Sequence, residues 1–163
     1  KKVYFLIQLS QYDLPIMKDL LYLKDEQIKD FIQLLYHAYR ETISDPKNIL
    51  TKKSFGPAHL RAINLIERYP GLSQSELMFK LKITKQSLNR VLRDLINSNI
   101  IKQIKDDTDT RKKKLFLDKD GILFFEKIYG SQKKRIFEAL KNSEPESVIK
   151  FKEVLNKIIN GKK

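Results

Sequence analysis

The stretch from Ser73 to Leu92, SQSELMFKLKITKQSLNRVL, predicts two short helices joined by a tight turn. Ser73 and Glu76 have the spacing of a capping box, in which each side chain bonds the other residue's backbone N–H at the start of a helix. Thr84 is placed to cap the second helix, expected over 85–98, whose apolar residues recur every three or four positions. Two helices connected so closely predict a helix-turn-helix.

The residues after this pair change from a helical to an extended pattern. Short apolar runs at 100–104 and 115–117 flank a polar segment, so we expect a two-stranded hairpin, or wing. Asp118 is placed to cap a long helix ending at Leu140, and Ser143 to Glu146 has the form of a second capping box before the last helix.

Two more helices are expected before the helix-turn-helix. The first covers 25–43 and is stopped by Asp45-Pro46, and the second opens at Gly56-Pro57, with proline at the first helical position. The fold class is therefore mainly α with a small β-hairpin, a winged helix-turn-helix with flanking helices.

The distribution of charge favours nucleic acid as the partner. The chain carries 33 Lys and Arg against 20 Asp and Glu, a formal charge of +13. Residues 80–114 supply +7 of this total, so more than half of it lies on the hairpin and on the second helix of the pair, 85–98, called the reader helix below. Such a surplus suits a polyanion, either nucleic acid or an anionic membrane surface. No apolar run approaches the ~18 residues of a membrane span, so we expect a soluble cytoplasmic protein without membrane contact.

The residue types at the start of the second helix suit the reading of base pairs. Amide side chains can form paired hydrogen bonds with adenine, and Arg or Lys with guanine, in the major groove. Arg111, at the hairpin tip, is the candidate for the minor groove, whose negative potential attracts arginine. We expect the following residues to contact DNA: Ser73, Gln74, Thr84, Lys85, Gln86, Ser87, Asn89, Arg90, Lys105, Asp109, Arg111 and Lys112.

These motifs resemble the MarR family of bacterial transcriptional regulators. The resemblance rests on Leu72 to Leu77, on the reader helix, and on Asp109-x-Arg111 followed by Leu117-x-x-x-Gly121. Asp118 stands where the family usually has threonine, and it can cap a helix about as well. The segments 55–61 and 82–92 are similar to the PetP-like branch of the family.

The resemblance implies a homodimer whose two winged domains bind a pseudo-palindromic duplex. It implies an N-terminal dimerisation helix at 23–45, a DNA-binding domain at 46–118 and C-terminal dimerisation helices at 119–163, and leaves residues 1–22 as an extension without an assigned role. It also implies that Asp109 orients Arg111. A small aromatic effector is a further expectation, with Tyr36, Tyr39, His59 and Tyr69 as candidate pocket residues, although helical tyrosines are more often part of a core.

Other functions are less well supported by the sequence. The absence of cysteine excludes thiolate metal sites and disulfides, and two histidines on separate helices make a weak metal site, so we expect no metal and no cofactor. The acidic run from Asp106 lacks the glycine and glutamate of a calcium loop. No nucleophile triad or glycine-rich phosphate loop is present, so we do not expect an enzyme. The remaining alternative is a winged-helix module that binds DNA without sequence preference or docks a protein.

Overall fold

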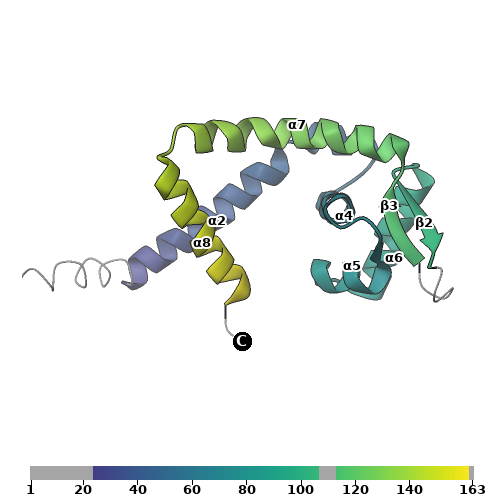
Figure 1. The fold of residues 1–163 in the computed structure, drawn as a ribbon, viewed down its shortest axis with the longest axis horizontal. Helices are drawn as coiled ribbons and strands as arrows, with labels where there is room; N and C mark the ends of the chain where they lie inside the picture. The colour runs from purple at the N-terminus through teal and green to yellow at the C-terminus, as the bar shows by residue number, and fades with distance from the viewer. Residues whose placement is uncertain (1–23, 107–112, 162–163) are drawn as a thin grey trace, which may run out of the picture. The chain divides into compact units, whose positions relative to one another are not determined.

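The computed structural model describes residues 24–106 and 113–161. The chain divides into two compact units, one ending at Glu41 and the other beginning at Thr42. Helix α2 (Asp25–Ser44) lies in the first unit except for its last three residues, 42–44, which belong to the second. The second unit contains, in chain order, α3 (Lys47–Thr51), α4 (Pro57–Arg68), β1 (Leu72–Ser73), α5 (Gln74–Leu81), α6 (Lys85–Asn97), β2 (Ile101–Lys105), β3 (Lys113–Leu117), α7 (Lys119–Lys141) and α8 (Pro145–Asn160) (Figure 1).

The helix-turn-helix forms as the local signals predict. The hydroxyl of Ser73 accepts a hydrogen bond from the Glu76 N–H at 3.2 Å, and the Ser73 N–H donates to the Glu76 carboxylate at 2.8 Å. Lys82 ends α5 in the left-handed conformation, with φ of 52°, which turns the chain sharply. Thr84 then caps α6 by accepting from the Ser87 N–H at 3.2 Å. The predicted fold class, a mainly helical winged helix-turn-helix with a small β-sheet, is confirmed.

The wing contains one strand more than the sequence predicts. β2 and β3 form the expected antiparallel hairpin, with Gln103 opposite Leu115. The two-residue strand β1 adds to the other edge of β3, with Leu72 opposite Leu115, so the order is β1-β3-β2. A two-residue strand has no periodicity of its own, and only its pairing with a distant strand defines it.

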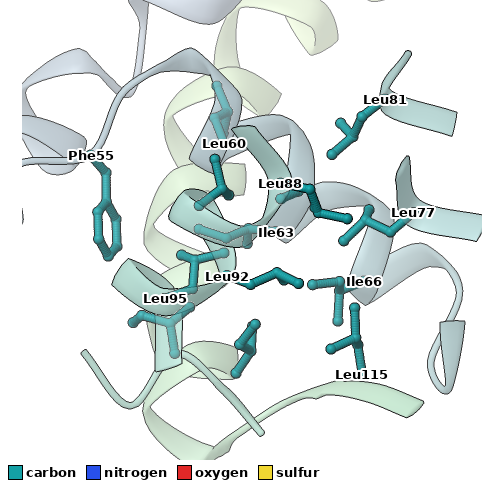
Figure 2. Packing of buried hydrophobic residues seen from close by; sticks show 14 of the residues in the cluster. Phe55, Leu60, Ile63, Ile66, Leu77, Leu81, Leu88, Leu92, Leu95 and Leu115 are labelled. Carbon is teal, nitrogen blue, oxygen red and sulfur yellow. The ribbon is translucent and has the colours of Figure 1, made fainter. Parts of the chain in front are cut away.

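A single hydrophobic core joins the helices α4, α5 and α6 to the base of the wing (Figure 2). Leu77 and Leu81 of α5 point into it beside Leu88, Leu92 and Leu95 of α6. All of these side chains are at most 5% exposed, so the apolar face predicted for each helix is the buried one. Burial of one face leaves the opposite face of α6 available to a partner.

Helix α7 approaches the wing unusually closely at Gly121. A Cβ atom at this position would lie 1.9 Å from the carbonyl oxygen of Ile100, so no larger residue fits without a backbone shift. The same carbonyl accepts a hydrogen bond from the Asp118 N–H at 3.0 Å, and the Asp118 carboxylate caps α7 as predicted. This close contact therefore requires glycine at position 121.

A bidentate ion pair ties the loop after α2 to α7 within the second unit. The guanidinium of Arg135 donates to both carboxylate oxygens of Asp45, at 2.8 to 3.1 Å. These hydrogen bonds and the adjacent positive charge hold the pKa of the Asp45 carboxyl below its usual value. The two residues are 90 positions apart, so the sequence offered no sign of the pair.

Two local predictions are wrong or incomplete. The capping box expected at Ser143 does not form: α8 begins at Pro145, and the Ser143 hydroxyl instead donates to the carbonyl of Ala139. A serine at the end of one helix can bond backward to that helix, which removes it from capping the next. The short helix α3 follows Pro46, where the sequence indicated only a helix stop.

Candidate nucleic-acid interface

The exposed face of α6 brings together most of the residues predicted to read DNA. Leu88, Val91, Leu92 and Leu95 hold this helix to the core from its other side. The exposed residues at its start are Thr84, Lys85, Gln86, Ser87, Asn89 and Arg90. Since α6 contains 13 residues and is capped at its first turn, these side chains project from a rigid element.

The side chains of α6 also form a hollow of about 530 Å³. Its lining consists of Gln86, Ser87, Asn89, Arg90, Arg93 and Asp94. Two guanidinium groups, two amides and a hydroxyl thus lie together on one surface. All of these groups can donate hydrogen bonds to phosphate or to base edges, whereas the carboxylate of Asp94 cannot.

Gln74, at the start of α5, lies beside the same surface. It lines a second hollow, of about 300 Å³, with Asn89 and Arg93 of α6 and Gln103 of β2. Ser73 lies one residue earlier, but its hydroxyl already donates to the Glu76 carboxylate at 2.6 Å. The main role that the structure gives Ser73 is to cap α5.

The hydroxyl groups at the start of α6 are connected in a way that leaves one proton available. Thr84 donates to the Ser87 hydroxyl at 3.0 Å and accepts from the Ser87 N–H. The Ser87 hydroxyl, as an acceptor of this bond, keeps its own proton for a partner. Thr84 acts as the cap, and Ser87 is the better candidate for contact with DNA.

The described part of the wing is cationic at its outer end. Lys105 is exposed and lies directly opposite Lys113 in the register of β2 and β3. Like charges opposite each other destabilise a hairpin slightly in the absence of a partner. Lys114, in contrast, pairs with Asp106 at 2.8 Å. Three predicted contacts at the tip, Asp109, Arg111 and Lys112, lie outside the described residues.

His59 of α4 connects to the reader helix rather than standing alone. Its Nε2 lies 3.1 Å from the Asp94 carboxylate of α6, and its Nδ1 accepts from the Gly56 N–H at 3.1 Å. The ring stacks on Phe55, with centroids 4.8 Å apart, and Phe55 meets Phe124 of α7 edge to face. These contacts give His59 a structural role within the winged domain.

The four residues predicted to form an effector pocket have different surroundings. Tyr36 and Tyr39 are exposed residues of α2, in the first unit. Tyr69 follows α4, and the ammonium of Lys80 lies 4.3 Å from the centre of its ring. None of the four lines the apolar hollow of about 350 Å³ on α7 that Tyr129, Ile136, Phe137 and Leu140 help to form. The pocket stays a prediction.

Three residues of this surface, Arg93, Asp94 and Gln103, are not among the DNA contacts predicted from the sequence. Arg93 lines both hollows of α6, and its spacing of three and four from Arg90 and Asn89 could have indicated this from the sequence alone. Asp94 follows Arg90 by four positions and could have been found in the same way, whereas Gln103 has no such signal, because only the packing of β2 beside α6 brings it to the surface.

Neither a membrane span nor a metal cluster occurs in the part of the chain that the structure describes. None of its helices is long and apolar enough to cross a bilayer. No three acidic or histidine side chains of residues 24–106 and 113–161 gather closely enough to hold a metal ion.

A capped helix pair on a shared core, followed by a small antiparallel sheet, defines the class of winged helix-turn-helix proteins. Within that class, a family model described as MarR family matches residues 54–112. The chain is also 37% identical over 146 residues to the HTH-type transcriptional regulator PetP of Rhodobacter capsulatus, covering 90% of this chain and 88% of that protein. The chain therefore belongs to the MarR family of transcriptional regulators, and the similarity to PetP agrees with the resemblance in its motifs.

Solved structures of other family members share the fold. A MarR family regulator from Silicibacter pomeroyi superposes with a TM-score of 0.71 at 17% identity, covering 87% of this chain and 95% of its own. NadR in complex with 4-hydroxyphenylacetate gives a TM-score of 0.68 at 20% identity, covering 78% of this chain and 91% of its own.

Proposed function

We propose that this protein is a homodimeric regulator that binds a pseudo-palindromic duplex DNA site, with α6 in the major groove and the wing in the minor groove. The observation that carries the proposal is the exposed face of α6. It presents amide, hydroxyl and guanidinium groups on a helix whose opposite face is fully buried. This is the arrangement by which a recognition helix reads base edges.

The individual side chains divide into two kinds of contact. Gln86, Asn89 and Arg90 have the chemistry for paired hydrogen bonds with bases. Lys85, Lys105 and Gln74 are the proposed phosphate contacts, which would set the position of the protein without reading sequence. A phosphate near Lys105 and Lys113 would relieve the repulsion between these two opposed ammonium groups.

The unpartnered apolar faces of three helices support the homodimer. Neither α2 nor α8 contains a buried residue. Large apolar side chains are exposed on α2, on α8 and on α7: Ile32 and Leu34 on α2, Phe137 on α7, and Ile149, Phe151 and Ile159 on α8. Exposed apolar surface on this scale is typical of an interface with another protein. A second copy of the chain would also supply the second winged domain for a pseudo-palindromic site.

A small aromatic effector is a secondary part of the proposal. Its support is the family fold and the 4-hydroxyphenylacetate bound to NadR. That compound is the first to test, by its effect on DNA affinity. Tyr36, Tyr39, His59 and Tyr69 remain the candidate contacts for such an effector.

The test begins with a duplex selected from a random pool by the wild-type protein. Arg90→Ala should weaken binding to this duplex by about 1–3 kcal/mol and relax its sequence preference, as expected for a base contact. Lys105→Ala should weaken binding to selected and scrambled duplexes alike and reduce the slope of log K against log salt by about one unit. Lys52, the exposed residue at the end of α3, lines neither hollow of α6, so Lys52→Ala should change neither quantity.

Fluorescence anisotropy titrations at several salt concentrations would measure all of these effects. A specific regulator should resist roughly 10³-fold excess of scrambled duplex. If the selected duplex has no advantage over the scrambled one, the protein is the non-specific or protein-docking alternative. If Arg90→Ala and Lys105→Ala lose affinity equally on both duplexes, the division into reading and positioning residues is wrong.

A further inference from the structure

The ring of His59 connects two elements that the DNA-binding proposal treats separately. Its Nδ1 accepts from the N–H of Gly56, the residue that precedes α4, while its Nε2 faces the carboxylate of Asp94 on α6. The His59 side chain is 12% exposed and the Asp94 side chain 41%, so the contact is partly shielded from water. It joins the start of α4 to the face of the reader helix.

The two hydrogen bonds together define the tautomer of the ring. A nitrogen that accepts from a backbone N–H carries no proton, so Nδ1 is bare. Nε2 must then carry the proton and donate it to the Asp94 carboxylate. The neutral Nε2–H form satisfies both partners, whereas a proton on Nδ1 would break the bond from Gly56.

Asp94 is the only acidic residue of α6, and it lies on the surface predicted to meet DNA. Arg90 precedes it by one helical turn, so its guanidinium could reach the carboxylate, and Arg93 lines the same hollow. Among the described residues, however, the ion-pair partner of Asp94 is His59, and neither arginine is paired. The contact with His59 turns the one negative charge of this surface towards α4.

We propose that His59 is a positioning residue for DNA recognition, which holds the Asp94 carboxylate and so leaves Arg90 and Arg93 free to bind DNA. The inference rests on the proposed function, because it assigns His59 a task only if these arginines contact DNA. Without the bond from Nε2, the carboxylate would compete with DNA for the arginines and would lie nearer to the phosphates. His59 itself contacts no DNA in this proposal.

Two substitutions separate this task from the structural role of His59 at the start of α4. His59→Asn keeps an acceptor near the position of Nδ1 but has no donor near that of Nε2. His59→Gln has a donor near the position of Nε2 but leaves the Gly56 N–H without its acceptor. We therefore expect His59→Gln to have the lower Tm and His59→Asn the lower affinity for the selected duplex, by about 3- to 5-fold, as one exposed arginine–carboxylate pair would cause.

A double-mutant cycle with Asp94→Asn completes the test. Asp94→Asn alone removes the competing negative charge from this surface and should bind the selected duplex more tightly than the wild type. In that background His59→Asn should no longer weaken binding, because no carboxylate remains to be held. Nitrogen-15 NMR of the imidazole at mildly alkaline pH should show the neutral Nε2–H tautomer.

Contrary results are easily recognised. If DNA affinity falls in the same order as Tm, or if His59→Asn costs the same in both Asp94 backgrounds, His59 is structural and this inference fails while the proposed function stands. A Nδ1–H tautomer would overturn it as well. If the wild-type protein shows no preference for the selected duplex, the proposed function itself fails, and the inference with it.

Discussion

Substitution of Gly121 by alanine should disrupt the junction between α7 and the wing. The new Cβ would lie 1.9 Å from the Ile100 carbonyl oxygen and 2.9 Å from its carbonyl carbon, whereas carbon–oxygen contacts normally exceed about 3.3 Å. Ile100 cannot easily retreat, because its N–H donates to Leu95 at 2.9 Å and its carbonyl accepts from Asp118. Relief of the overlap requires a movement of α7 or β2 by more than about 1 Å.

The size of the effect follows from two opposing contributions. Overpacking against the backbone costs about 3 kcal/mol, at the upper end of the usual range. Alanine regains at most about 1 kcal/mol over glycine, the value for a helix interior, because Gly121 is only the third residue of α7. The free energy of unfolding should therefore fall by at least about 2 kcal/mol, which lowers Tm by roughly 4–8 °C or more for a chain of this length.

Gly130→Ala is the matched control in the same helix. A Cβ at Gly130 meets nothing within 4 Å, so the substitution should stabilise the protein by about 0.5–1 kcal/mol. Thermal and urea unfolding of both variants, at equal protein concentration, would measure the difference. Equal stabilities, or a Gly121→Ala variant more stable than the wild type, would show that the close approach at Ile100 does not constrain this residue.

Two further predictions concern the ion pair at α7 and the oligomeric state. Because hydrogen bonds from Arg135 lower the pKa of Asp45 in the folded state, the pair stabilises the protein above the unfolded-state pKa, and this stability is lost as the pH falls through the folded-state value. Asp45→Asn should thus lower the free energy of unfolding by about 1 kcal/mol near neutral pH, and by progressively less below about pH 4. Urea unfolding across that pH range would measure this loss, and a loss that does not change with pH would contradict the prediction. Sedimentation of the wild-type protein at micromolar concentration should give twice the chain mass of 19.3 kDa. Phe137→Glu should shift the measured mass towards that of the monomer, whereas Phe79→Glu, which changes an exposed phenylalanine of α5, should not. A monomeric wild type would refute the dimer.

The amino-acid sequence was sufficient for every feature that depends on near neighbours in the chain. The box of Ser73 and Glu76, the cap at Thr84 and the helix start at Pro57 involve residues at most three positions apart, so their spacing alone predicts them. The buried and exposed faces of α6 follow in the same way from helical periodicity. Even so, local spacing misled at Ser143, where two neighbouring helices competed for one hydroxyl.

The tertiary structure decided the features that join distant residues. His59 and Asp94 are 35 positions apart, Arg135 and Asp45 are 90, and β1 exists only because it pairs with β3. No periodicity or capping rule relates such residues, because the geometry that unites them arises only when α4, α6, α7 and the sheet pack on one core. The sequence alone thus determined which helix presents amide and guanidinium groups on its exposed face. The packing determined that the one carboxylate of this helix faces a histidine, since only the folded chain brings the two side chains within 3.1 Å.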